Sequence, residues 1–226
     1  MPGAMMSFSE TVRARSSVRR FRPDPVPEAL LRTVLEEAQR APSNCNTQPW
    51  QVHIVSGAAR DRMAAALDAA WVAQRLSPDF FFEGPAYPGV FGVRRREQGM
   101  SYLQAMGVAR DDHQGRDALS RQNLDFFGAP HAAFLLMPAV GDHVRVAADV
   151  GMYAQTLLLS LVAHGLGGVP QTMLGFFGDV VRAALGIGED FRLLFGISFG
   201  YPDQDAPEAG YRMDRAPIEE AVTFHS

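Results

Sequence analysis

The stretch APSNCNTQPW, residues 41–50, separates a segment with helical periodicity from a segment that alternates like a strand. Apolar residues before it, over 28–40, recur on one helical face, whereas residues 51–55 are rich in β-branched and alternating side chains. The residues between them are small or polar and carry more hydrogen-bonding groups than a turn requires. We expect this loop to hold a polar ligand; the alternative is an elaborate helix-to-strand connection built on Asx turns.

Outward from this loop, helices and strands alternate along the chain. The expected helices are 8–15, which follows the capping box Ser7–Glu10, and then 28–40, 58–75, 144–164 and 179–185. The expected strands are 51–55, 131–137, 193–199 and an edge strand at 221–224. Few strands and many helices predict an α+β fold, with helices packed around one sheet.

Two segments do not follow the simple pattern. Residues 77–130 are rich in Phe, Gly and Pro and predict an excursion over the surface or over a site, within one domain spanning 1–226. The helix over 144–164 is apolar nearly all round, so it must be buried in a core or against a second subunit. Its polar flanks and Gln155 argue against a membrane span.

Composition excludes several classes of protein. The net charge of −4 and the pI of about 5.9 argue against nucleic-acid and membrane-surface partners. The only cysteine is Cys45 and no signal peptide is evident, which favours a reducing, cytoplasmic location. All 21 basic residues are arginine, so a P-loop lysine and a pyridoxal Schiff base are both excluded. Any phosphate must be held by arginine, hydroxyl and backbone N–H groups.

Arginines near the two ends of the chain are candidates for that role. In an extended segment Arg15, Ser17 and Arg19 would point the same way and could bind a phosphate and one more anionic centre. Arg212 and Arg215 occur in the tail. The alternatives are a solvated basic turn and plain surface charge.

Other motifs are weaker. Residues 196–200 match the G-x-S-x-G pattern around Ser198, with Asp203 and His225 in the order of a hydrolase triad. A Tyr-Pro-Asp sequence follows where the elbow requires a helix, so a serine hydrolase is a remote alternative. No G-x-G-x-x-G motif is complete. The six histidines lack metal-binding spacing, and no metal site is expected.

Three short stretches and the closing third of the chain, in this order, resemble the nitroreductase family of FMN-dependent flavoproteins. RSSVRRF (15–21) matches the family's Arg-x-Ser-x-(Arg/Lys) segment, and residues 41–50 match its Pro-Ser-x-x-Asn-x-Gln-Pro-Trp loop. GLGGVPQT (165–172) matches its glycine turn, and three later stretches match its closing third: VVRAALGI, LLFGISFGYPD and RMDRAPIEEAVTF. The resemblance covers nearly the whole chain. It implies a central, mainly antiparallel sheet flanked by helices, in an intertwined homodimer with FMN sites at the interface.

The resemblance also implies the cofactor site. Arg15 and Ser17 would hold the FMN phosphate with a contact from Ser16, and Arg212 and Arg215 would close on it from the tail. Arg19 would lie by the flavin N1/O2 edge. Four residues would approach from the other subunit: Pro42, Ser43, Asn44 and Asn46. Three would line the ring near N5: Pro170, Gln171 and Thr172.

The implied activity is a ping-pong oxidoreductase. NADH or NADPH would deliver hydride to the flavin, and a nitroaromatic, quinone or similar acceptor would then be reduced, without a side-chain nucleophile or acid–base pair. A positive Arg19 would stabilise the reduced flavin. The aromatic residues expected to stack on flat substrates, or alternatively to pack the dimer, are Phe81, Phe82, Tyr87 and Phe91. Alternatives on the same fold are flavin reduction or fragmentation, reductive dehalogenation, and FMN binding without catalysis.

Overall fold

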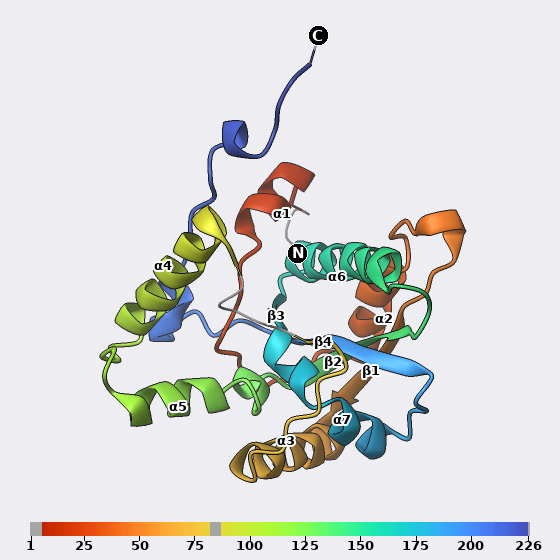
Figure 1. Ribbon diagram of the computed structural model, residues 1–226, viewed down its shortest axis with the longest axis horizontal. Coiled ribbons are helices and arrows are strands. Elements are labelled where there is room, and N and C mark those ends of the chain that lie inside the picture. The colour runs from red at the N-terminus through yellow and green to blue at the C-terminus, as the bar shows by residue number, and fades with distance from the viewer. Residues whose placement is uncertain (1–5, 82–86, 226) are drawn as a thin grey trace.

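The computed structural model describes residues 6–81 and 87–225 (Figure 1). Its strands are β1 (Gln51–Ser56), β2 (His131–Pro138), β3 (Gly167–Gln171) and β4 (Phe191–Gly200). Its α-helices are α1 (Phe8–Ala14), α2 (Glu28–Ala38), α3 (Gly57–Val72), α4 (Gly89–Ala105), α5 (His113–Arg121), α6 (Val144–Ala163) and α7 (Gly178–Leu185). Shorter 3₁₀ turns are η1 (Asn44–Asn46), η3 (Phe126–Gly128), η4 (Thr172–Phe176), η5 (Pro207–Gly210) and η6 (Ile218–Glu220).

The four strands form one antiparallel sheet in the order β1-β2-β4-β3. The central strand β2 is an almost continuous apolar run, because both of its faces are covered. Ala132 of β2 is opposite Val55 of β1 on one side and Ser198 of β4 on the other. The expected antiparallel α+β arrangement is therefore present.

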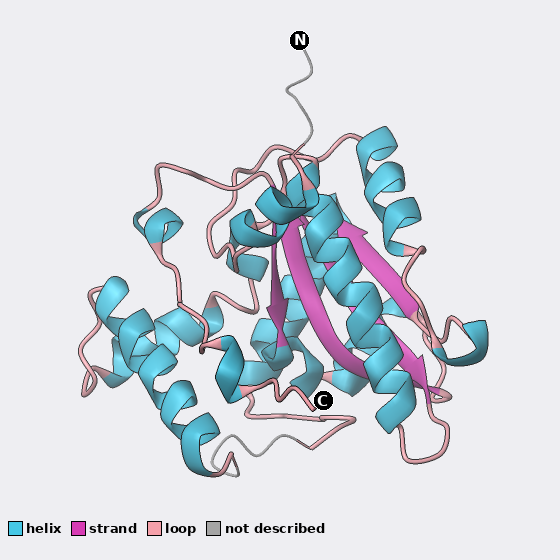
Figure 2. Ribbon diagram, turned by 90° about the horizontal axis from the view of Figure 1, so that it is seen from above, coloured by secondary structure: helices cyan, strands magenta, loops and turns pink. Residues whose placement is uncertain are grey.

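Helices cover both faces of the sheet, as Figures 1 and 2 show, with α2 and α6 on one face and α3 and α7 on the other. Alternate residues of β2 enter the two cores: Ala133 and Leu135 face α6, whereas Phe134 and Leu136 face α3. Both cores contain large, fully buried side chains, such as Phe134 on one face and Leu135 on the other. The sheet is thus the rigid layer from which the loops of the site extend.

Helix α6 is, among the described residues, the one helix whose length and composition would allow it to cross a membrane. Eight of its residues, including Leu157 and Leu161, are buried, and it packs on α2, β2 and β3. The core that α6 covers therefore explains why these buried residues are apolar.

Three expectations about elements need correction. The glycine-rich stretch 165–172 was expected as a turn, but strand β3 begins within it at Gly167. Short helical pieces were expected within residues 77–130, but α4 in this range has 17 residues. The edge strand expected at 221–224 does not form: η6 ends at Glu220, the following residues are exposed, and Figure 1 shows the tail leading away from the sheet. A strand needs a neighbour for its hydrogen bonds, and the described chain places none beside this segment.

Candidate functional site

The Arg15–Arg19 segment leaves α1 and runs along the outer edge of β3. Ser17 forms a parallel bridge with Gly168, and the Val18 N–H donates to the Gly168 carbonyl at 3.3 Å. A Cβ on Gly167 would lie only 2.6 Å from Cγ2 of Val18. The glycines of 165–168 therefore allow the arginine-serine segment to approach the sheet edge closely.

This segment forms one wall of a cavity of about 1030 Å³, which we call the arginine cavity. The tail forms another wall, and residues of α1, α4 and α6 together with Pro170 complete the lining. The sequence-predicted residues that the structure brings together here are Arg15, Ser16, Ser17, Arg19, Pro170, Arg212 and Arg215. Groups from the two ends of the chain thus share one cavity.

The charges in this cavity are unbalanced, because five arginines but only one carboxylate, that of Asp214, line it. Burial lowers the pKa of Arg15, and the neighbouring charges of Arg215 and Arg212 lower that pKa further. Arg212 donates to the backbone carbonyls of Ala209 and Tyr211, and Arg215 to those of Met213 and Asp214. Within residues 6–81 and 87–225, no carboxylate pairs with Arg15, Arg212 or Arg215. Three guanidinium groups beside two serines are suited to a phosphate.

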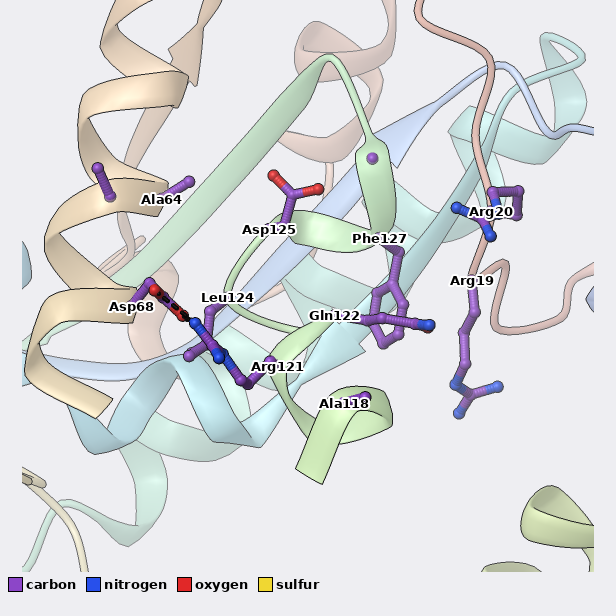
Figure 3. Close-up of a pocket in the computed structure, with 12 residues that line it drawn as sticks. Arg19, Arg20, Ala64, Asp68, Ala118, Arg121, Gln122, Leu124, Asp125 and Phe127 are labelled. Carbon is purple, nitrogen blue, oxygen red and sulfur yellow. Dashed lines mark hydrogen bonds and ion pairs between the residues drawn. The ribbon is translucent and has the colours of Figure 1, made fainter. Parts of the chain in front are cut away.

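Arg19 occupies a different environment at the end of the same segment. Its Nη1 donates to the Ser17 carbonyl at 3.3 Å, and its guanidinium carbon lies 4.8 Å from the ring centroid of Tyr102 and 5.9 Å from that of Tyr211. Figure 3 shows Arg19 and Arg20 across a neighbouring cavity of about 450 Å³ from the ion pair of Asp68 and Arg121. Arg19 lines both cavities and so lies where they meet.

The 41–50 loop does not line the cavity of about 1030 Å³. Its 3₁₀ turn η1 is held to α6 by a hydrogen bond from the Asn44 N–H to Oδ1 of the buried Asp149, at 3.1 Å. Asn44 and Asp149 line a separate cavity of about 460 Å³, and Pro42 and Asn46 are exposed. A single chain therefore does not bring Pro42, Ser43, Asn44 and Asn46 to the arginines.

The residues after the glycine turn are placed differently from what was expected. Pro170 lines the arginine cavity and Thr172 is exposed, but Gln171 is 3% exposed and turns into the core. Its Nε2 donates to the backbone and side-chain oxygens of Asn123, at 3.0 and 3.2 Å, and its Oε1 accepts from the Ser198 hydroxyl. The Gln171 side chain faces the core because successive side chains of β3 point to opposite faces, so only its backbone is left to line a flavin ring.

The structure contradicts the serine hydrolase alternative. Ser198 is fully buried within β4, which continues to Gly200, and its hydroxyl is bonded to Gln171. A nucleophile elbow requires an exposed serine on a strand-to-helix turn, and neither condition is met.

Among the described residues, the aromatic side chains of the excursion do not line the cavity of about 1030 Å³ in one chain. Phe81, Tyr87 and Phe91 are exposed, with Phe81 at 83%, and Phe82 lies outside the described residues. No group of three or more potential metal ligands occurs among the described residues.

Sequence reasoning missed several residues of the cavity wall: Gln98, Gln155, Leu158, Tyr211 and Met213. Gln155 had one available signal, because it is a polar residue in an otherwise apolar helix. Tyr211 had none, since its place depends on how the tail packs on α4.

The chain is similar to known proteins over most of its length. The sequence model of the Nitroreductase family matches residues 12–201. Nitroreductase NfnB of Mycolicibacterium smegmatis is 46% identical over 213 residues, covering 94% of this chain and 90% of that protein. A 4-nitrobenzoate reductase of Nocardioides sp. is 34% identical, covering 98% of this chain and 91% of that protein.

Solved structures confirm the fold. FMN-dependent NfnB from Mycobacterium smegmatis, in complex with NADPH, has a TM-score of 0.93 at 45% identity, covering 96% of this chain and 97% of that one. FMN- and NADPH-dependent NfnB from Sphigopyxis sp. strain HMH has a TM-score of 0.94 at 36% identity, covering 98% and 100%. The four-stranded antiparallel sheet and its helices are those of the expected fold, and the chain belongs to the nitroreductase family.

Proposed function

We propose that the chain is an FMN-dependent oxidoreductase that uses NADPH or NADH to reduce nitroaromatics, quinones or similar electron-poor acceptors. The observation that carries the proposal is the cavity in which Arg15, Arg212 and Arg215 meet without a carboxylate partner among the described residues. The printed activities of the similar proteins, nitroreductase and 4-nitrobenzoate reductase, support the same reaction class.

The donor groups fit FMN. Its phosphate is a compact anion, and Arg15, Ser16, Ser17, Arg212 and Arg215 would bind it with charge-assisted hydrogen bonds. A chain without lysine has no other cationic side chain for this purpose apart from histidine. When bound, FMN would supply the redox chemistry, accepting hydride from a reduced nicotinamide and passing electrons to the acceptor.

The other roles fall to residues of this chain that orient and enclose the ring. Arg19 would provide a fixed positive charge, and Pro170, Thr172 and the backbone of Gln171 would line one face. A second copy of the chain would supply Pro42, Ser43, Asn44 and Asn46, because one chain leaves them apart from the arginines. The protein would accordingly be a single-domain homodimer, and we place it in the cytoplasm.

Substrates would enter over the same ring. The exposed residues Phe81, Tyr87 and Phe91 would stack on flat acceptors, together with Phe82. Aromatic rings favour such offset-stacked contacts.

An absorption spectrum and one turnover assay test the proposal. The purified protein, supplied with FMN, should show flavin bands and oxidise NADPH faster when 4-nitrobenzoate is added. The Arg15→Ala/Arg215→Ala variant should be pale, whereas Arg32→Ala, which removes an exposed ion pair on α2, should remain yellow. A yellow double variant would overturn the phosphate assignment. Flavin binding without turnover with any acceptor would instead show a non-catalytic flavoprotein.

A further inference from the structure

Two tyrosines hold the guanidinium group of Arg19. The guanidinium carbon lies 4.8 Å from the Tyr102 ring centroid and 5.9 Å from the Tyr211 centroid. The two rings contact each other, with centroids 5.4 Å apart and planes inclined by 56°. No carboxylate pairs with Arg19 within the described parts of the chain, so the aromatic rings are its main side-chain neighbours.

The two rings come from segments that are distant in sequence. Tyr102 lies on α4 within the excursion, and Tyr211 lies in the tail. The Tyr211 hydroxyl donates to the Gln98 carbonyl at 3.3 Å, one turn before Tyr102 on the same helix. Figure 1 shows the tail passing beside α4. The tail and α4 therefore present both rings to Arg19 as one unit, which we call the tyrosine pair.

The position of Arg19 gives this contact its importance. Arg19 lines the cavity of about 1030 Å³ and the neighbouring cavity of about 450 Å³. An arginine side chain has many rotamers, and holding it in one of them costs conformational entropy. A cation over an aromatic face is attracted by the ring quadrupole, and this attraction offsets part of that cost.

We propose that Tyr102, supported by Tyr211, is a positioning residue that fixes the Arg19 guanidinium at the cofactor cavity. This inference rests on the proposed FMN site and identifies residues, outside the arginine-serine segment, on which that site depends. It also links the excursion to the cofactor. Movement of α4 would move the two tyrosine rings, and with them the Arg19 charge beside the bound flavin.

The experiment compares four proteins: wild type, Tyr102→Leu, Tyr102→Phe and the control Tyr201→Leu. Tyr201 carries a similar contact with Arg22, at 5.8 Å, away from the cavity of about 1030 Å³. The FMN dissociation constant is measured by titration of the apoprotein, and the midpoint potential by equilibration with redox dyes. Tyr102→Leu should weaken FMN binding about fivefold, in line with one partly exposed cation–π contact. It should also lower the potential, because a mobile charge stabilises the reduced, more negative flavin less. Tyr102→Phe and Tyr201→Leu should match wild type.

A second comparison separates positioning from a general structural effect. In the Arg19→Gln background, Tyr102→Leu should change FMN affinity by less than about twofold, because residues that act through one contact are not additive. Equal losses with and without Arg19 would overturn the proposal. So would a Tyr102→Phe variant as weak as Tyr102→Leu, since the hydroxyl rather than the ring would then matter. A wild-type protein that binds no FMN would refute the proposed function itself, whereas FMN binding unaffected by Tyr102→Leu would refute only this inference.

Discussion

At the scale of single residues, His131 shows how one side chain can make the fold depend on pH. It is 3% exposed at the start of β2 and stacks on Phe199, with ring centroids 5.3 Å apart. Its Nε2 accepts a hydrogen bond from the Val26 N–H at 2.9 Å, so Nδ1 must carry the proton that faces the Ser56 hydroxyl. Protonation of Nε2 would leave the Val26 N–H without its acceptor.

We predict that the protein loses stability below about pH 6.5 and that His131 contributes to this loss. Burial lowers the pKa of His131 in the folded state, whereas the unfolded side chain titrates near 6.5. The stabilisation is therefore complete above that pH and declines as the pH falls, because the unfolded chain binds the proton first. Urea unfolding at pH 8 and pH 5.5 would measure the difference.

The control for this prediction is His131→Gln, since burial also lowers the pKa of His53. The variant should be less stable than wild type at pH 8 but should change less between the two pH values. An unchanged pH dependence would assign the effect to other groups.

Site residues were predictable where a side chain acts through local chemistry. One cavity brings together the arginines and serines of residues 15–19 and the two arginines of the tail, as the motif resemblance implies. The burial of the Gln171 side chain was not predicted, because the glycines and the proline of β3 do not give the sequence pattern of a strand. Tyr102 was not found because cation–π partners are brought together only by the tertiary fold.

At the scale of elements, contact between β3 and the Arg15–Arg19 segment depends on Gly167. We predict that Gly167→Ala destabilises the protein by about 1–3 kcal/mol and weakens FMN binding. The new methyl group would lie 2.6 Å from Cγ2 of Val18, whose β-branched side chain has few alternative rotamers. Chemical denaturation and FMN titration would measure the two effects.

The matched control is Gly188→Ala, because a Cβ at Gly188 would have no neighbour within 4 Å. Its stability and FMN affinity should equal those of wild type. If Gly167→Ala behaves in the same way, the segment does not need this close approach.

A second element-scale feature fixes the start of the excursion. The Asp79 side chain is 3% exposed, forms an ion pair with Arg182 of α7 and lies 3.4 Å from Nη1 of Arg192. Its Oδ2 also accepts from the Leu193 N–H at 2.8 Å. One buried carboxylate thus ties the chain before α4 to both α7 and β4.

We predict that Asp79→Asn lowers the free energy of unfolding by about 2 kcal/mol, because the partly buried Arg182 loses its counter-charge. Asp61→Asn, which removes an exposed partner of Arg60, should change it by less than about 0.5 kcal/mol. Equilibrium unfolding in urea distinguishes the two. If both variants lower the free energy of unfolding equally, burial does not strengthen the contribution of the Asp79 contacts to stability.

Most elements could be predicted because their apolar periodicity matches the core that they bury. Helix α2 and strand β2 lie within a few residues of their expected bounds. The strand predicted at 221–224 does not form, because a β-rich composition does not by itself supply a neighbouring strand for hydrogen bonds. The ion pairs of Asp79 were not predictable, because they join positions more than 100 residues apart.

At the scale of the whole molecule, several exposed apolar side chains are candidates for the interface of the proposed dimer. Phe8, Phe81 and Phe224 are 77%, 83% and 86% exposed, and Ile218 and Val222 add to the tail. Exposed apolar side chains that gather in one patch often mark a protein–protein interface. These residues come from α1, the excursion and the tail, and the proposed dimer would cover part of them.

We predict that light scattering of the holoprotein gives twice the chain mass of 24.7 kDa. Ile218→Ser/Phe224→Ser should shift the protein towards monomer and weaken FMN binding, because the second copy would supply the 41–50 loop. Val72→Ser, at an exposed position on α3, should leave the mass unchanged. A monomeric wild type that binds FMN fully would contradict the proposed role of that loop.

The cavity whose walls come from residues 15–19 and 211–215 has a consequence for biosynthesis. During translation Arg15 is made about 200 residues before Arg212 and Arg215, so a nascent chain that has not reached residue 215 lacks two of the three arginines that we propose for the phosphate. Capture of the cofactor should therefore follow synthesis of residues 211–215. Products that terminate before this segment should be colourless even in cells rich in flavin.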